Sequence, residues 1–303
     1  MSNYPLHQRR LHRFIVLWRV ALALALLGAL IPTATFAAIP DEDAARPPAL
    51  ANAVPGILLA STGAVTVQAV PNAPNACPAS PSGLPDVIER TNFCVYYDDG
   101  NVTDGQADDV ADFTQLYWDR YVTDFGFRAP AFTNKLVIEI QNDTSCNGGT
   151  SPSSNDFYVY DECFDLARLM QKVVGHELFH RVQYAYHGTE VKWFKEGTAR
   201  AIEDLAFAEL DNWPQAMSAP SSFNSQADNY LMNTNVDITS IPQRYNSALW
   251  WKYFTEQFGS DPDEPELGVD ALLRLWEAAE TLDDIAALNQ ALTNLGAGAN
   301  FDV

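Results

Sequence analysis

The segment Val173–Val182 reads VVGHELFHRV and constrains the chain more than any other stretch. His176 and His180 are four residues apart, and residues at that spacing share one face of a helix, so both imidazoles can reach a single ion. Glu177 lies on the adjoining face, where it can touch a water on that ion without ligating the ion. Val173, Val174, Leu178 and Val182 are apolar, which predicts a buried helix.

Histidines are scarce in the rest of the chain. Beyond residue 37 there are three, at positions 176, 180 and 187. Two of these three form the HExxH pattern on an apolar helix, which makes a chance match a poor explanation. Neutral imidazoles suit zinc, and three protein ligands leave a fourth position for water. The pattern therefore predicts one zinc ion (Zn2+) per chain.

The third ligand has to come from another part of the chain. A third histidine on the same helix is excluded, because Tyr186 stands ten residues after His176. His187 comes one residue later, which turns it about 100° away from the ligand face. The segment Trp193–Asp204 (WFKEGTARAIED) supplies carboxylates instead. We expect Glu196, near its start, to be the third ligand.

Three other carboxylates compete with Glu196. Glu190 follows His180 by ten residues, which leaves little chain to end one helix and begin another. Glu203 and Asp204 lie two turns deeper in the second helix than Glu196. Glu203 projects from the same helix face as Glu196, so we expect its carboxylate to accept the second N–H of a ligating histidine.

Two motifs together resemble a known group of enzymes. HELFH at His176–His180, followed by WFKEGTARAIED, is similar to the gluzincin zinc peptidases, whose third ligand is the glutamate of a W-x-x-E-G block. With the segment Tyr245–Trp251, the chain resembles more narrowly a family of secreted bacterial metalloproteases. The likeness covers roughly residues 92–295. It implies a zincin-like fold and a zinc-dependent peptidase with three metal ligands, His176, His180 and Glu196.

Two features bear on how far this resemblance extends. Arg181 directly follows the second histidine, a position that is usually uncharged in zincins. The G-x-M-E-N segment of the aminopeptidase gluzincins is absent, so exopeptidase action has no support. We therefore expect an endopeptidase, although the sequence does not decide between endo- and exopeptidase action.

Glu177 is the expected catalytic base. A zinc ion lowers the pKa of its water to about 7, and Glu177 would take the proton and return it to the leaving amine. The developing oxyanion requires a further donor. Tyr245 and His187 are the candidates, although a core tyrosine and a solvated loop histidine are the structural alternatives for these two residues.

Two other functions remain open. One is a catalytically inactive zincin-like protein that binds peptides or cell-surface partners. The other is a structural surface protein, for which a Pro/Ala-rich leader is the only indication. Because the HExxH residues and Glu196 are all present, we expect the chain to hydrolyse peptide bonds in a peptide or protein substrate.

The first part of the chain predicts export. Residues 1–37 combine four arginines, an apolar run over Val20–Ile31 and small residues before a cleavage site after Ala37, which is typical of a signal peptide. Residues 38–85 hold nine of the 18 prolines and predict a linker or propeptide. Residues 86–303 form the expected zincin-like domain. We expect a secreted or periplasmic protein with no stable membrane anchor after cleavage.

The cysteine count predicts disulfides, and the net charge restricts the class of partner. Four cysteines in an exported chain predict two disulfides, and of the three possible pairings the chain order favours Cys77–Cys94 and Cys146–Cys163. The alternative is that the Cys77 thiolate caps the metal. The formal net charge of −21 repels phosphate backbones, which excludes a nucleic-acid partner.

Hydrophobic periodicity predicts strands first and helices afterwards. The expected strands are Asn92–Tyr97, Lys135–Gln141 and Phe157–Tyr160, with a loop at Asp143–Asn155. The expected helices are Gln106–Phe125, a helix capped by Asp165 that runs towards Tyr186, Glu196–Leu210, Gln243–Phe258, Gly268–Ala279 and Leu282–Leu295. This order predicts an α+β fold, in which a small N-terminal sheet and an active-site helix precede a mainly helical C-terminal part.

Overall fold

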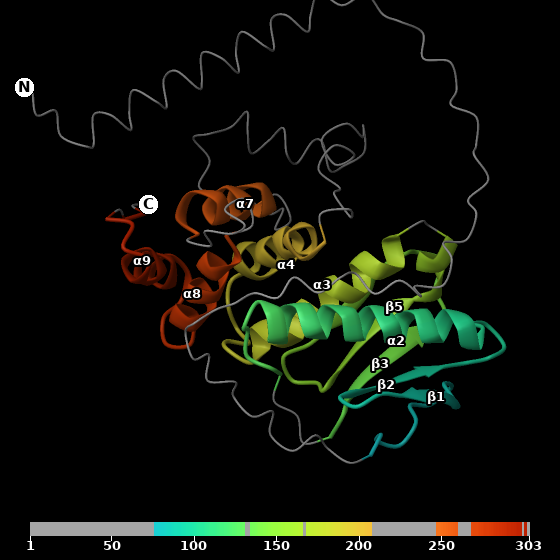
Figure 1. Ribbon diagram of the computed structural model, residues 1–303. Helices are drawn as coiled ribbons and strands as arrows, with labels where there is room; N and C mark the ends of the chain where they lie inside the picture. Colours follow the sequence, from blue (N-terminus) through green and yellow to red (C-terminus); the bar gives the residue numbers. More distant parts are fainter. Residues whose placement is uncertain are drawn as a thin grey trace, which may run out of the picture. The chain divides into compact units, whose positions relative to one another are not determined.

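The computed structural model of the chain describes residues 76–130, 134–165, 168–207, 247–259, 268–298 and 300–301. These residues form an α+β fold with a mixed five-stranded sheet and several helices (Figure 1). The fold class expected from the sequence is thereby confirmed. The expected signal peptide, most of the 38–85 leader and Tyr245 lie outside the described residues.

The sheet combines parallel and antiparallel pairs. Its strands are β1 (Asp86–Glu89), β2 (Phe93–Tyr97), β3 (Leu136–Gln141), β4 (Gly148–Thr150) and β5 (Asp156–Tyr160). They lie in the order β1-β2-β3-β5-β4. The central strands β2, β3 and β5 are parallel, and β1 and β4 pair antiparallel at the two edges. The three predicted strands are the parallel ones.

Helices follow and interrupt the sheet. They are α2 (Asp104–Trp118), the π-helical turn η1 (Asp119–Asp124), the 3-10 turn η2 (Asp161–Asp165), α3 (Leu169–Tyr184), α4 (Lys192–Ala206), α7 (Ser247–Phe258), α8 (Val269–Ala279) and α9 (Asp284–Asn294). Each predicted helix has a counterpart in the described residues, and the expected end at Leu210 and the expected start at Gln243 lie outside them. The side chain of Thr103 caps α2 and forms a capping box with Gln106.

Three local expectations were wrong. Asp165 does not cap the helix that carries the histidines, because it ends η2, and α3 begins at Leu169 after Arg168 with a φ of 62°. The expected loop at 143–155 contains β4, whose Gly-Gly-Thr sequence has no strand pattern and becomes a strand by pairing with β5. Helix α4 begins at Lys192, four residues before the expected start.

The two faces of the sheet have different partners. Phe93 and Val95 of β2 join a large core shared with α2 and α3. Cys94 and Tyr96, on the opposite face, join a small cluster with Leu84 from the segment before β1. Every residue of β2 is therefore buried, as expected for a strand covered on both faces.

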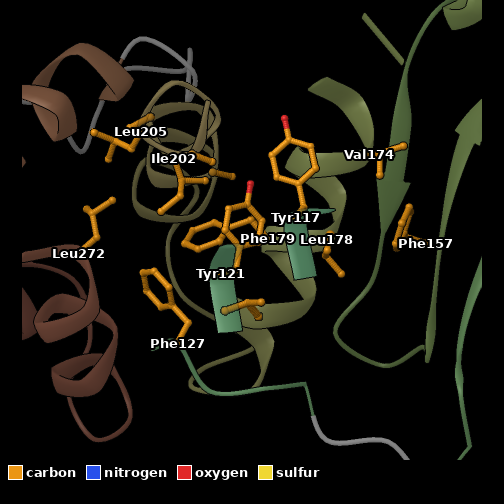
Figure 2. Close-up of a cluster of buried hydrophobic side chains, with 14 of the residues drawn as sticks. Tyr117, Tyr121, Phe127, Phe157, Val174, Leu178, Phe179, Ile202, Leu205 and Leu272 are labelled. Carbon is orange, nitrogen blue, oxygen red and sulfur yellow. The ribbon is translucent and has the colours of Figure 1, made fainter. Parts of the chain in front are cut away.

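Gly175 brings α2 and α3 into close contact. A Cβ atom at this position would clash with the ring of Tyr117, and the hydroxyl of Tyr121 donates to the carbonyl of Gly175 at 3.2 Å. Phe179 packs its ring edge-to-face with both Tyr121 and Phe127, at centroid distances of 5.2 Å (Figure 2). Since His176 directly follows Gly175, this packing fixes the position of the histidine face.

Gly197 brings α4 and α7 into close contact, as Gly175 does for α2 and α3. A Cβ atom there would lie 2.6 Å from Trp251 Cδ1 and would clash with Ser247 Oγ. The carbonyl of Trp193 accepts hydrogen bonds from Ser247 Oγ at 2.7 Å and from Trp251 Nε1 at 3.0 Å. The two indoles stack at a centroid distance of 5.0 Å. Helix α4 is thus held against α7 next to Glu196.

Both predicted disulfides are confirmed. Cys77 pairs with Cys94, which ties the segment before β1 to β2. Cys146 pairs with Cys163, which ties the residues before β4 to η2. The alternative of a Cys77 thiolate on a metal is therefore wrong. In the described part of the chain, no helix is long and apolar enough to cross a membrane.

Candidate metal centre

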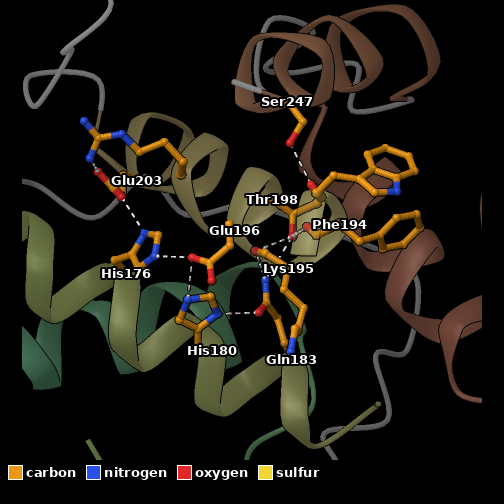
Figure 3. A network of polar contacts seen from close by, with 11 residues as sticks. His176, His180, Gln183, Phe194, Lys195, Glu196, Thr198, Glu203 and Ser247 are labelled. Atoms are coloured by element: carbon orange, nitrogen blue, oxygen red, sulfur yellow. Dashed lines mark hydrogen bonds and ion pairs between the residues drawn. The ribbon is translucent and has the colours of Figure 1, made fainter. Parts of the chain in front are cut away.

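Helices α3 and α4 bring the three predicted metal ligands to one point. His176 and His180 project from α3 towards Glu196 of α4 (Figure 3). The Nε2 atoms of both imidazoles lie 3.4 Å from the same carboxylate atom, Glu196 Oε2. The rings are perpendicular, with centroids 4.6 Å apart. The two imidazoles and the carboxylate therefore converge as a possible metal-binding group.

The second nitrogen of His176 is held by a buried carboxylate. His176 Nδ1 lies 2.9 Å from Glu203 Oε1, which confirms the contact expected from the sequence. A carboxylate only accepts hydrogen bonds, so Nδ1 carries a proton, and Nε2 is the nitrogen that faces Glu196. Glu203 is 2% exposed and also accepts a hydrogen bond from Arg200 at 2.7 Å. Arg200 thus balances the charge of this buried acceptor.

Gln183 holds the other imidazole. Its side-chain Oε1 lies 2.7 Å from His180 Nδ1, and its Nε2 donates to the carbonyl of Lys195 and to Thr198 Oγ1, both at 2.9 Å. Because the amide nitrogen is occupied by these acceptors, Oε1 accepts the proton on His180 Nδ1. Gln183 therefore orients His180 and, through Lys195, joins α3 to the residue just before Glu196.

The donor set fits zinc. Two imidazole nitrogens and one carboxylate oxygen are the protein ligands of many catalytic zinc sites. Ligand atoms about 2.0–2.1 Å from a tetrahedral ion lie roughly 3.3–3.4 Å apart, and both nitrogen–oxygen distances here are 3.4 Å. These two distances match the spacing of ligand atoms around such an ion.

The cluster shifts the pKa values of His176 and Glu196 in opposite directions. Burial lowers the pKa of His176, but hydrogen bonds to the carboxylates of Glu196 and Glu203 outweigh this effect and raise the pKa to about 10. Burial raises the pKa of Glu196, and hydrogen bonds to His176 and His180 outweigh it, so the net shift is well below the usual range. The cluster therefore stabilises positive charge at the point where its donors meet.

Glu177 lies beside this cluster and next to a cavity. Its side chain lines, together with His176, a cavity of about 270 Å³. Gly148 of β4 packs closely against this side chain. A Cβ atom at position 148 would lie 2.8 Å from Glu177 Cγ, so the contact requires a glycine. Burial raises the pKa of the Glu177 carboxyl. A buried carboxylate with a raised pKa is suited to take up and release a proton near neutral pH.

The competing carboxylates have other partners. Asp204 forms an ion pair with Lys252 of α7, and Glu190 lies near His187. His187, an expected oxyanion donor, contacts Thr189 and belongs to a different group from the three ligands. This position gives no support to a catalytic role for His187.

Two residues at the centre were missed by the sequence reasoning. The sequence reasoning assigned Gln183 no role, because only the packing of α3 on α4 shows what its amide contacts. Tyr184 stacks near His180 at a centroid distance of 6.1 Å. Burial, followed by the charges of Glu177 and Glu196, raises the pKa of Tyr184 to about 12, so its hydroxyl stays protonated. An aromatic residue one turn after the second histidine is the only trace of it in the sequence.

Arg181 has a structural role at this site. Arg181 is 6% exposed, and its guanidinium donates to the carbonyl of Ser151 at 2.8 Å, beside Thr150 Oγ1 at 3.4 Å. It therefore holds the end of edge strand β4 against α3. This contact explains a charged residue at a position where the resemblance implies an uncharged one.

No protein-family model matches this sequence, and comparison with curated proteins gives no match. The chemistry of the site itself is therefore the basis for a function.

Proposed function

We propose that this chain is a secreted zinc-dependent endopeptidase with a zincin-like catalytic domain. The observation that carries the proposal is the convergence of His176 Nε2 and His180 Nε2 on Glu196 Oε2, each at 3.4 Å. The hydrogen bonds from Nδ1 of each histidine leave the ligating nitrogens directed inwards. The two disulfides support an oxidising, extracytoplasmic setting.

The proposed roles follow from the chemistry of peptide hydrolysis. When bound, zinc supplies a Lewis acid that polarises the substrate carbonyl and makes water a better nucleophile. Glu177 accepts the proton of the attacking water and delivers it to the leaving amine. Its raised pKa suits both directions of transfer. His176, His180 and Glu196 hold the metal.

Strand β4 offers a place for an extended peptide. It is an edge strand of the described sheet, paired with β5 on one side only. A peptide can add to such an edge by backbone hydrogen bonds. Gly148 of β4 packs against Glu177, so a peptide bound along this edge would pass close to the base. Arg181 keeps the edge in position through Ser151.

Tyr184 is the donor that we propose for the developing oxyanion. Its phenol is half-buried, and its pKa is influenced by both Glu177 and Glu196, which places it in the electrostatic environment of the site. A phenol that stays protonated can donate a hydrogen bond to an anion. Tyr245, the candidate from the sequence, lies outside the described residues and stays a prediction.

The variant Glu177→Gln tests the proposal. The amide has the size of the carboxylate but accepts no proton, so peptidase activity should fall by about 10²–10⁴-fold, while zinc content stays at the wild-type level. Glu162→Gln, in η2, is a control that should leave both unchanged. Near-normal hydrolysis by Glu177→Gln would rule out the proposed base. Stoichiometric zinc in a wild-type protein that cleaves no peptide would favour the inactive binding protein instead.

The variant Tyr184→Phe tests the oxyanion donor. Loss of one such donor costs about 10²–10³-fold in kcat, and KM and zinc affinity should change little. An unchanged kcat would remove Tyr184 from the mechanism and leave Tyr245 as the candidate to be examined.

A further inference from the structure

A second group of metal-binding side chains lies where two connections meet. His187 and Glu190 belong to the connection between α3 and α4, and Asp283 directly precedes α9. His187 Nδ1 lies 3.9 Å from Glu190 Oε1 and 3.6 Å from Asp283 Oδ1. One ligand atom from each residue lies within 4.8 Å of the others. None of these residues takes part in the proposed hydrolysis.

The imidazole of His187 contains a buried nitrogen that lacks a hydrogen-bond partner. Nδ1 makes no hydrogen bond in the described structure, whereas Nε2 lies 2.9 Å from Thr189 Oγ1. The gaps of 3.6 and 3.9 Å to the carboxylates are too long for hydrogen bonds. A buried polar atom left in this way needs an explanation, and a cation between the nitrogen and the two carboxylates supplies one.

The two carboxylates also favour a bound cation. Asp283 is the N-cap residue of α9, yet its side chain makes no capping hydrogen bond and instead lies towards His187. The side chain of Glu190 is fully buried, and its oxygens accept the backbone N–H groups of Asp284 at 2.9 Å and Val191 at 2.8 Å. Backbone donors do not neutralise its charge. Among the described residues, only His187 brings a basic side chain within ion-pair distance of Glu190.

We propose that His187, Glu190 and Asp283 bind a second divalent transition-metal ion of the zinc class. Calcium and magnesium take oxygen ligands, so the imidazole disfavours them. One nitrogen and two carboxylate oxygens suit zinc and its neighbours. The sequence predicted a single zinc ion, because His187 faces away from the HExxH pair and its partner Asp283 is distant in the chain.

The second ion has a structural consequence. Trp193, at the start of α4, already donates from Nε1 to Asp284 Oδ1 at 2.9 Å. A metal held by Glu190 and Asp283 adds a second link between the start of α4 and the start of α9. Because α4 also carries Glu196, the ion would fix the helix that delivers this ligand.

Zinc stoichiometry tests the proposal. The metal-free full chain is loaded with Zn2+ and dialysed against excess Mg2+, which displaces ions held loosely by surface acids, and zinc is then measured by elemental analysis. We expect two ions in the wild type and one in Asp283→Asn. We expect one in His176→Ala and none when the two changes are combined. Asp270→Asn, in the first turn of α8, is the matched control and should keep two.

The outcomes separate the two metal groups. If Asp283→Asn and His187→Gln keep the wild-type number of ions, the second site is overturned. If instead His176→Ala keeps the wild-type number, the proposed catalytic site fails and the second site stands. Zinc should also raise the melting temperature of His176→Ala and leave that of the combined variant unchanged, which detects binding even where one variant folds poorly.

Discussion

The two histidine–carboxylate groups of this chain differ in what holds their side chains. The first takes all its ligands from within α3 and α4, and each imidazole has a fixed second partner, Glu203 or Gln183. The second takes its ligands from two connections, and the side chain of Asp283 is 79% exposed. Donor spacing in the first group is 3.4 Å twice, against 3.6 and 3.9 Å in the second.

This difference indicates a division of tasks. In the first group the ligands lie on packed helices, and Nδ1 of each imidazole is hydrogen-bonded. Such ligands are held in place before a metal binds, as a catalytic site requires. Ligands on connections can adjust, which suits an ion whose task is to join segments. If helices α3 and α4 set the geometry of the first group, changes to its ligands, to the partners of its imidazoles and to its packing should alter zinc binding.

Removal of Glu196 should have the largest effect. Glu196→Ala leaves the first group with two histidine ligands and without its carboxylate ligand, so tight zinc binding and peptidase activity there should be lost. Asp204→Asn is the control, because Asp204 lies on the same helix but pairs with Lys252. Isothermal titration of zinc into both variants measures the difference. Normal zinc binding at the first group by Glu196→Ala would require another third ligand.

Loss of a partner of an imidazole should weaken zinc binding without abolishing it. Glu203→Ala removes the acceptor of His176 Nδ1, and we expect an affinity about 10–100-fold lower. Glu203→Gln keeps an acceptor oxygen and should lie closer to the wild type. Equal losses in the two variants would show that charge, and not orientation, is what Glu203 supplies.

Zinc affinity of the first group should depend on pH. His176 has a pKa of about 10 in the metal-free protein, above its ordinary 6.5, and zinc binds neutral imidazole. Metal binding near neutral pH must therefore displace this proton, so affinity should rise as pH increases, by up to about tenfold per unit. Titrations in zinc buffers between about pH 6 and 8 measure this slope. In Glu203→Ala the pKa of His176 should be lower and the slope smaller.

The smallest expected effect concerns the packing behind the first group. Gly197→Ala places a methyl group against Trp251 and Ser247, which should destabilise the fold by about 1–3 kcal/mol and lower first-site zinc affinity a few-fold. Gly105→Ala is the matched helical control, since a Cβ atom there meets nothing within 4 Å. Thermal unfolding and zinc titration compare the two. Unchanged zinc affinity in Gly197→Ala would mean that α7 does not position Glu196.

The sequence by itself predicted the elements whose residues carry a local pattern. The three central strands alternate, the helices have apolar spacing, and HExxH places two histidines on one face. The choice of Glu196 over Glu190 depended only on how much chain a turn between two helices needs. The disulfides followed from chain order in an exported protein.

Only the tertiary structure decided features that depend on distant partners. Strand β4 consists of Gly-Gly-Thr and exists because β5 pairs with it. Gln183 became a partner of His180 when α4 supplied acceptors for its amide. Asp283 lies close to His187 because α9 packs near the α3–α4 connection. No periodicity in the sequence predicts this contact. Local patterns fix which face of an element is buried, whereas long-range packing fixes which side chains of different elements meet.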